Sequence, residues 1–548
     1  MDFMGEFQFF KNVFFSYITL IFVAGLFIFM DYGFDTDLFL NFIENCLFAF
    51  LIIVAAFCIK HHKIRVIYGY LSLLIFSFLL LFETVYYLMF HVFFNASSLY
   101  VILDTNSSEV SEFFSFYVGF IEVLFMVLFF FLTLFFLKRN KKSYKELIPL
   151  SSKKIAVYML SLFGVLVYLK LSKQIIYNLP YLVAKSVYEY TQISKSFDIY
   201  VENKEGNFTN VQFQSDQHNS VFVLILGEST VRTHMGLYGY ERQTTPLLKS
   251  ISDQLWIYPD VISPHTQTVE SVTKMLTLGN YEAPEKIESG SIVQLANAAG
   301  FDTFWLSNQR PVGMYESLVT KIALSASMTK FLTVAPVNTN LVLDQVLLPE
   351  LDKVLKNNSG KPKFIVIHLM GTHFDYQNRY PDSLKAFSNV PKLNYDSKEN
   401  HNNVNAYDQA VLYTDYIVTD VINKVKTVST QSTVLYLSDH GEELYTDKNM
   451  AGHNESIATK SMYDIPFVLW QSDQYKKSKS LIFDAQRPYM TDDLFHSLAQ
   501  LLKIKATEVK TKRSIFSHNF QNRQRIILGN EDYDVKFDSI DNQNSSLK

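Results

Sequence analysis

Long apolar runs dominate the first third of the chain. They cover about residues 12–30, 38–59, 66–94, 113–137 and 155–171. A helix needs roughly 20 apolar residues to cross a bilayer, and the first four runs satisfy that length. The fifth is shorter, but lysines at both of its ends can extend their side chains to the headgroups. The pattern predicts an α-helical transmembrane domain with five spans over residues 1–171.

The loops between these runs differ in charge. Lysine and arginine gather at 60–65 and 138–145, whereas the loops at 31–37 and 95–112 carry acidic residues and neither Lys nor Arg. The positive-inside rule places the basic loops in the cytoplasm. An odd number of spans then puts everything after Lys173 outside the cytoplasm, which is the periplasm if the source is a Gram-negative bacterium.

Three acidic residues, Glu44, Glu83 and Glu122, fall inside the apolar runs. Carboxylates within a membrane are costly and often mark a functional site, here an entry for a lipid headgroup. The alternative is that Glu44 and Glu122 lie near the ends of their spans, where water and headgroups solvate them. The sequence leaves both interpretations open.

Residues 172–215 read as a bridge. Apolar side chains recur near helical spacing up to about residue 187, with Lys and Tyr among them, which is typical of a helix lying on a membrane interface. The polar stretch that follows, Asn203–Ser220, reads as a linker.

The remaining residues, 216–548, alternate between short apolar runs and stretches with helical spacing. The predicted buried strands are Val221–Leu226, Thr303–Leu306, Phe364–Leu369, Val434–Leu437 and Ile465–Trp470. Strands that alternate with helices indicate an α/β domain with a mostly parallel central sheet.

Polar residues follow three of these strands. Glu228 comes just after the first, His373 after the third, and Asp439 and His440 directly after the fourth. In open α/β sheets, chemistry collects past the carboxyl ends of the strands. Aspartate with histidine is a ligand pair suited to zinc, although each residue alone could also serve as a helix cap or a packed loop residue.

Two further stretches could join such a site. His453 lies on a loop downstream, and the hydroxyl-rich segment Ile262–Lys274 opens what looks like a helix, whose N-terminus would attract phosphate. A divalent cation makes a coordinated hydroxyl easier to deprotonate, so a threonine could become a nucleophile in phosphoryl transfer. Additional histidines could hold phosphoryl oxygens or protonate a leaving alcohol. These arguments do not choose between Thr266 and Thr268.

Charge and cysteine content exclude some classes. The formal net charge of −4 gives no indication of a nucleic-acid partner. Both cysteines, Cys46 and Cys58, lie in apolar runs. The polar two-thirds therefore can contain neither a disulfide framework nor a CxxC metal site.

Together, several motifs resemble the phosphoethanolamine transferases. They are GESTVRTHMGLYGYERQTTPLL at Gly227–Leu248, ISPHTQT, the MGTH of 370–373, and SDHGEEL with the following GH. That family comprises inner-membrane enzymes of Gram-negative bacteria with five membrane helices and an alkaline phosphatase/sulfatase-like periplasmic domain. The resemblance implies a multi-pass inner-membrane protein with its catalytic domain in the periplasm. It also implies transfer of phosphoethanolamine from phosphatidylethanolamine to lipopolysaccharide, on a core sugar or lipid A, through a zinc-bound phospho-threonine.

The resemblance also assigns roles to individual residues. It places Glu228, Thr268, Asp439 and His440 on the zinc ligands, with Thr268 as the nucleophile. The residues that it implies for substrate binding are His373, His453, Asn308 and Gln309. Donor, acceptor and membrane lipids are the expected partners, with no nucleic acid, and the chain is expected to act as a monomer.

Two departures from the lipid A-modifying members stand out. The soluble domain lacks their disulfides, and Val312 occupies the position of a lysine found near the substrate in those members. Both favour an acceptor other than lipid A without excluding it.

Three alternatives can be compared with this interpretation. A sulfatase would need a C/S-x-P-x-R motif, which the chain lacks. A phosphoglycerol transferase of the lipoteichoic acid synthase type would share the architecture but not the GEST…LYGYERQTTP stretch. A non-enzymatic membrane-anchored sensor would require an incomplete metal set.

Overall fold

The computed structural model divides the chain into two compact units. One contains Met1–Tyr100 and Tyr117–Thr191, and the other contains Val101–Phe116 and Gln192–Lys548. The structure describes residues 2–537 except 34–35, 92, 95–97, 100–101, 103–109, 111–112, 115, 148–151, 197, 216–218, 310–317, 334–341, 390–391, 429–430 and 479–480. Val312 therefore lies outside the described residues.

The first unit is a bundle of long helices. They are α1 (Asp2–Tyr32), α2 (Thr36–Cys58), α3 (His62–Phe90), α6 (Phe120–Glu146) and α7 (Ser152–Leu171). All five are long and apolar enough to cross a membrane, so the predicted five-helix domain is confirmed. Phenylalanine, leucine and isoleucine side chains from several helices pack into its core.

The acidic residues of the bundle have specific partners. Helix α6 begins at Phe120 rather than near residue 113, and the Glu122 carboxylate in its first turn accepts the Gly119 N–H at 2.9 Å. Glu83 accepts the Asn41 amide at 2.8 Å, and Glu44 accepts the Asn178 amide at 2.8 Å. Each carboxylate is thus held by a neighbouring polar group.

The chain then passes through three further helices into the second unit. These are η1 (Gln174–Tyr177), α8 (Leu179–Ser196) and α9 (Asp198–Glu202). After α9, the Gln294 side chain donates to the Asn203 carbonyl at 2.5 Å, and Lys204 donates to the Ala326 carbonyl at 3.1 Å. These bonds fasten the start of the predicted linker to the second unit.

A seven-stranded sheet forms the centre of the second unit. Its strand order is β3 (Leu255–Ile257), β11 (Phe467–Gln471), β8 (Ser432–Ser438), β2 (Val221–Gly227), β7 (Lys363–His368), β5 (Asp302–Ser307) and β6 (Met328–Phe331). Of these seven, β11 alone runs against the others. The predicted mostly parallel sheet is confirmed. The last predicted strand begins at Phe467, after Pro466, which lacks the N–H that a central strand must donate.

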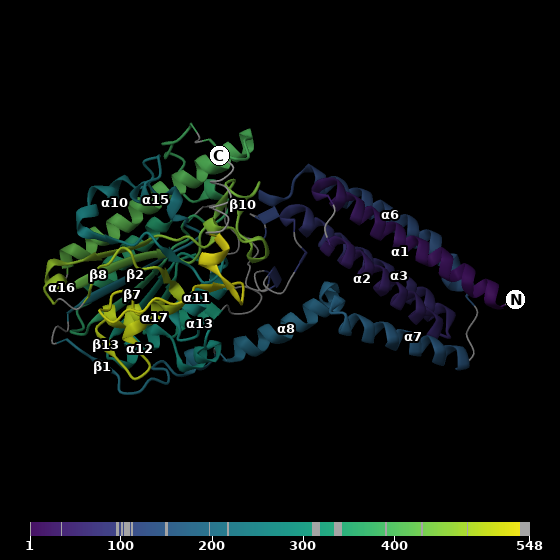
Figure 1. Cartoon of the computed structure of the whole chain (residues 1–548), viewed down its shortest axis with the longest axis horizontal. Helices are drawn as coiled ribbons and strands as arrows, with labels where there is room; N and C mark the ends of the chain where they lie inside the picture. The colour runs from purple at the N-terminus through teal and green to yellow at the C-terminus, as the bar shows by residue number, and fades with distance from the viewer. Residues whose placement is uncertain are drawn as a thin grey trace. The chain divides into compact units, whose positions relative to one another are not determined.

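Helices cover both faces of this sheet (Figure 1). On β2, Phe222, Leu224 and Leu226 pack into one core cluster, whereas the alternate residues pack into the other. The first face is covered by α11 (Thr268–Leu276), α12 (Ile292–Ala298), α13 (Leu318–Leu324) and α17 (Leu494–Leu501). The second is covered by α10 (Pro246–Ser250), α14 (Leu347–Lys356) and α15 (Lys398–Val428).

Short elements complete the unit. They are α16 (Asp473–Lys477) and the strand pairs β1 (Gln212–Phe213) with β13 (Ile504–Lys505), β4 (Val261–Ile262) with β12 (Tyr489–Met490), β9 (Glu443–Leu444) with β10 (Ala451–Gly452), and β14 (Ile526–Ile527) with β15 (Glu531–Asp532).

The part of the GEST…LYGYERQTTP stretch from His234 onward is bound to α15 by a buried carboxylate. Asp408 lies within 2.7 Å of His234 Nδ1, accepts the Tyr240 hydroxyl at 2.9 Å, and pairs with Arg242 at 2.7 Å. Its side chain is fully buried. This part of the motif therefore builds the fold around the site.

Removal of that carboxylate should destabilise the second unit. Asp408→Ala leaves the Arg242 charge buried without its partner, which costs about 3–5 kcal/mol in comparable cases. We expect a fall of several degrees in the thermal midpoint of the purified protein. Asp420→Ala, on the exposed side of the same helix, removes an ion pair with Lys424 at 3.7 Å and is the matched control. Equal midpoints for the two variants would contradict the structural role of Asp408.

Candidate metal centre and nucleophile

The strand register brings distant acidic residues to one edge of the sheet. Strands β2 and β8 are parallel neighbours, and Gly227 pairs with Ser438 at their carboxyl ends. Glu228 and Asp439 are the next residues on the two strands, so their side chains emerge side by side. His440 follows Asp439 directly, and Thr268 is the first residue of α11.

Four predicted site residues meet here within hydrogen-bonding or ion-pairing distance. Thr268 Oγ1 lies 3.1 Å and 3.3 Å from the two carboxylate oxygens of Glu228. His440 Nε2 lies 3.3 Å from Glu228 Oε1, 3.5 Å from Asp439 Oδ2 and 3.5 Å from Thr268 Oγ1. The side chains of Glu228, Asp439 and His440 are at most 1% exposed.

This arrangement fits a divalent cation. One ligand atom from each of Glu228, Asp439 and His440 lies within 4.8 Å of the others. Asp439 Oδ2 is buried and accepts no hydrogen bond from the described residues, which leaves a lone pair free for coordination. Two carboxylates, an imidazole and a hydroxyl form a four-ligand set of the kind that zinc accepts.

The pKa shifts within the cluster show that its buried carboxylates require a compensating positive charge. Burial raises the pKa of Asp439 to about 7, and the neighbouring Glu228 charge acts in the same direction. Burial alone would lower the pKa of His440, but Asp439 and Glu228 raise it to about 10. A second proton on His440, at Nε2, thus supplies the compensating charge that a metal ion would supply.

Backbone groups hold the candidate ligands Asp439 and His440 in place. Ser229, in the left-handed region at φ 55°, donates its N–H to Asp439 Oδ1 at 3.0 Å. The His440 N–H donates to the same oxygen at 2.8 Å. His440 Nδ1 lies 2.8 Å from the Gly441 carbonyl, so Nδ1 carries the proton and Nε2 faces the cluster.

Two glycines of the motifs are required by close approach. A Cβ at Gly371, which has φ 54°, would lie 2.8 Å from the Glu228 carbonyl oxygen. A Cβ at Gly441 would lie 2.0 Å from the Ser461 carbonyl oxygen. The glycines in MGTH and DHG therefore let neighbouring loops pack against the ligand-bearing turns.

The two candidate threonines have different partners. The Thr266 hydroxyl and N–H both donate to Glu455 Oε2, at 3.0 Å and 2.9 Å. Of the two hydroxyls, only that of Thr268 donates to Glu228. The geometry thus directs Thr268, rather than Thr266, into the ligand set.

The predicted substrate-binding pair Asn308 and Gln309 divides. Gln309 donates to Glu228 Oε2 at 2.8 Å and so touches the cluster. The Asn308 amide donates to Asp344 and to the Val342 carbonyl, each at 2.9 Å, and its oxygen accepts the Thr333 hydroxyl. Its contact with a substrate stays a prediction.

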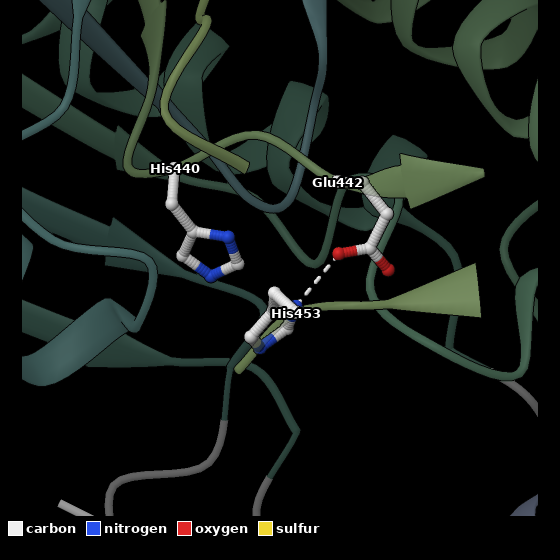
Figure 2. A group of neighbouring side chains, drawn as sticks. All are labelled: His440, Glu442 and His453. Atoms are coloured by element: carbon white, nitrogen blue, oxygen red, sulfur yellow. Dashed lines mark hydrogen bonds and ion pairs between the residues drawn. The ribbon is translucent and has the colours of Figure 1, made fainter. Parts of the chain in front are cut away.

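His453 stands beside His440 (Figure 2), with ring centroids 4.1 Å apart. Its Nδ1 lies 2.7 Å from Glu442 Oε2, and Glu442 Oε1 accepts the Tyr376 hydroxyl at 2.5 Å. A second possible metal-binding group, His440, Glu442 and His453, therefore adjoins the first. His373 is near enough to Glu228 for their charges to interact, and burial lowers its pKa to about 3, so its ring is neutral.

Sequence reasoning missed Glu442 and Tyr376. Glu442 stands two residues after His440 in DHGEE, and that spacing was an available signal. Tyr376 is three residues after His373 in a loop, and no pattern in the sequence links it to Glu442.

Comparison with known proteins places this architecture. Residues 220–504 match the family model described as Sulfatase, which is more than half of the 548-residue chain. The chain belongs to the sulfatase family. The matched range runs from the residue before β2 to the start of β13 and includes every residue of the cluster.

Phosphoethanolamine transferases are among the relatives of this sulfatase-family protein. It is 28% identical to phosphoethanolamine transferase EptC of Escherichia coli O18:K1:H7 (strain RS218 / NMEC) over 474 residues, 81% of each chain. The zinc complex of the C-terminal periplasmic domain of EptC from Escherichia coli has 29% identity and a TM-score of 0.57. It covers 60% of this chain and 96% of that domain. The predicted resemblance is confirmed.

A solved membrane protein shares the whole architecture. The integral membrane protein lipooligosaccharide phosphoethanolamine transferase A from Neisseria meningitidis aligns with a TM-score of 0.63 and 22% identity, covering 92% of this chain and 97% of that one. At this identity the likeness concerns the fold. The sulfatase-family protein is a multi-pass membrane protein with a sulfatase-like domain.

Proposed function

We propose that this protein transfers phosphoethanolamine from phosphatidylethanolamine to lipopolysaccharide through a covalent phospho-Thr268 intermediate. The observation that carries the proposal is the Thr268 hydroxyl, placed 3.1 Å from Glu228 within the Glu228, Asp439 and His440 ligand set. The named phosphoethanolamine transferases among the relatives support the transferred group and the class of acceptor.

Zinc fits the four donors Glu228, Thr268, Asp439 and His440, and when bound it would make the Thr268 hydroxyl easier to deprotonate and offset charge on the phosphoryl group. The rest of the work falls to the chain. Thr268 begins α11, whose N-terminal N–H groups and dipole favour a phosphate there. Glu228 accepts the Thr268 hydroxyl and so orients its oxygen for attack on phosphorus.

In this proposal, His453 and His373 interact with oxygens of the phosphatidylethanolamine donor. Because Glu442 accepts the proton on Nδ1 of His453, Nε2 of that ring is left to face the site. When Nε2 also carries a proton, His453 can donate that proton to the diacylglycerol oxygen as it leaves. His373 Nδ1 is buried without a hydrogen-bond partner among the described residues, so the neutral ring is available to a phosphoryl oxygen or the headgroup.

Cells with and without the protein provide the direct test. Mass spectrometry of their lipopolysaccharide should show an added phosphoethanolamine only when the protein is present, and fragmentation should assign it to core sugar or lipid A. Identical lipopolysaccharide from both strains would contradict the proposal.

We further propose that the protein resides in the inner membrane as a monomer, with its catalytic domain, residues 216–548, in the periplasm. The basic loops after α2 and within the end of α6 support this orientation. Reporter fusions at Lys63 and Lys141 should give cytoplasmic signals, because both positions belong to the basic loops. A periplasmic signal at either position would overturn the orientation.

A further inference from the structure

A second histidine–carboxylate pair involves the segment that leads to the nucleophile. His265 precedes Thr268 by three residues, and its Nδ1 lies 3.0 Å from Glu455 Oε1. Glu455 follows His453 by two residues. His265 thus belongs to the loop that leads into α11, and its ring is hydrogen-bonded to the segment that carries His453 and Glu455.

The Glu455 carboxylate is held firmly in this position. Its second oxygen, Oε2, accepts both the N–H and the hydroxyl of Thr266, at 2.9 Å and 3.0 Å. The Glu455 side chain is only 15% exposed, whereas the His265 ring is 21% exposed. Two donors from one residue fix the carboxylate, and the carboxylate in turn fixes the ring.

This geometry sets the tautomer of His265. An ionised carboxylate accepts hydrogen bonds but cannot donate them, so Nδ1 of His265 carries the proton. Nε2 is then the atom with a free lone pair. A neutral imidazole oriented by a carboxylate through its other nitrogen is the usual arrangement of a general base.

We propose that His265 is the general base for the acceptor in the second half of the reaction, with Glu455 as its positioning residue. His265 Nε2 takes the proton of an acceptor hydroxyl as that oxygen bonds to phosphorus. The bond between phosphorus and Thr268 Oγ1 breaks, and Oγ1 takes up a proton from water, which restores the hydroxyl that donates to Glu228. The proton then leaves His265 for bulk water.

The inference rests on the proposed function and narrows its acceptor to a hydroxyl group. A phosphate acceptor is already ionised and would need no base. His373 is a poor alternative because burial lowers its pKa to about 3. His453, once deprotonated in the first half-reaction, is the competing base that the test must separate.

The two half-reactions can be measured separately in the full-length protein. Phosphatidylethanolamine in detergent micelles loads Thr268, and intact-mass spectrometry follows the adduct before and after purified lipopolysaccharide is added. For His265→Gln we expect loading at the wild-type rate and transfer to lipopolysaccharide slowed by roughly 100-fold or more, the usual effect of removing a general base. His265→Ala should behave alike, and added imidazole should restore part of its transfer rate. Glu455→Gln should slow transfer without slowing loading.

His401→Ala is the matched control, because His401, on α15, also pairs with a carboxylate, that of Asp396, at 2.7 Å. It should leave both rates unchanged. Wild-type transfer in His265→Gln, with a loss only in His453→Gln, would overturn the proposal in favour of His453. Equal slowing of both steps without rescue by imidazole would overturn it in favour of a structural role. Absence of any adduct on the wild-type protein would instead refute the phospho-Thr268 intermediate, and the inference with it.

Discussion

Thr268→Ala should abolish phosphoethanolamine transfer while leaving the fold and membrane insertion intact. The variant removes one hydroxyl at the start of α11 whose hydrogen-bond partners Glu228, Asp439 and His440 all belong to the candidate metal centre. Loss of a catalytic nucleophile lowers turnover by roughly a thousandfold or more. Transfer to lipopolysaccharide and the covalent adduct should both disappear, and peptide mapping of the wild-type adduct should assign it to Thr268.

Other hydroxyl variants make this result specific. Thr273→Ala changes a buried hydroxyl on the same helix that has no hydrogen-bond partner among the described residues, so it should retain transfer. Thr268→Ser keeps a hydroxyl and should retain part of the rate. Full turnover in Thr268→Ala would point to Thr266 or to direct transfer between donor and acceptor.

Asp439→Asn should remove metal from the protein. The substitution preserves size but replaces a charged oxygen ligand by a neutral amide, next to an imidazole and a second carboxylate. The wild-type protein, equilibrated with zinc and then desalted, should contain about one equivalent of zinc by elemental analysis, because four ligands converge. The variant should contain far less and should lose transfer, since the same ligand set orients the nucleophile.

Chelation provides the complementary test. Treatment of the wild-type protein with a chelator should abolish transfer, and zinc should restore it. Asp464→Asn is a suitable control for Asp439→Asn and should keep its zinc. Asp464 is a buried carboxylate that pairs with Arg232 at 2.9 Å rather than with the cluster. If the wild-type protein contains no zinc after equilibration with zinc at saturating concentration, the metal site is refuted.

Much of this site could be predicted because it is built from strand ends. Apolar runs identify β2 and β8, and parallel strands place their carboxyl ends at one edge. Glu228 and Asp439 therefore had to lie near each other if the two strands were neighbours, as the register of Gly227 with Ser438 shows. The five membrane helices could also be predicted, since the bilayer sets their length and apolar composition.

The parts that could not be predicted depend on contacts between loops. The residue pattern alone did not choose Thr268 over Thr266, and only the family resemblance implied Thr268. The different partners of the two hydroxyls, Glu228 and Glu455, appear only in the three-dimensional structure. The bonds of Glu442 to Tyr376 and His453 likewise join three separate loops. Side-chain direction was also hidden. Asn308 and Gln309 are adjacent in sequence, yet only Gln309 contacts Glu228.

The sequence also did not reveal every helix boundary and strand direction. The apolar run from residue 113 does not reveal that α6 begins only at Phe120, because the signal is the hydrogen bond between Gly119 and Glu122. The reversed direction of β11 is hidden for a similar reason. A buried strand reads as a continuous apolar run whichever way it points.

The convergence of Glu228, Thr268, Asp439 and His440 on one cation can be observed directly by anomalous diffraction at the zinc absorption edge. Crystals of the zinc-loaded protein should give a single strong peak among the four side chains, at about 2.0–2.2 Å from their oxygen and nitrogen ligand atoms. A peak elsewhere, or none among these side chains, would contradict the account.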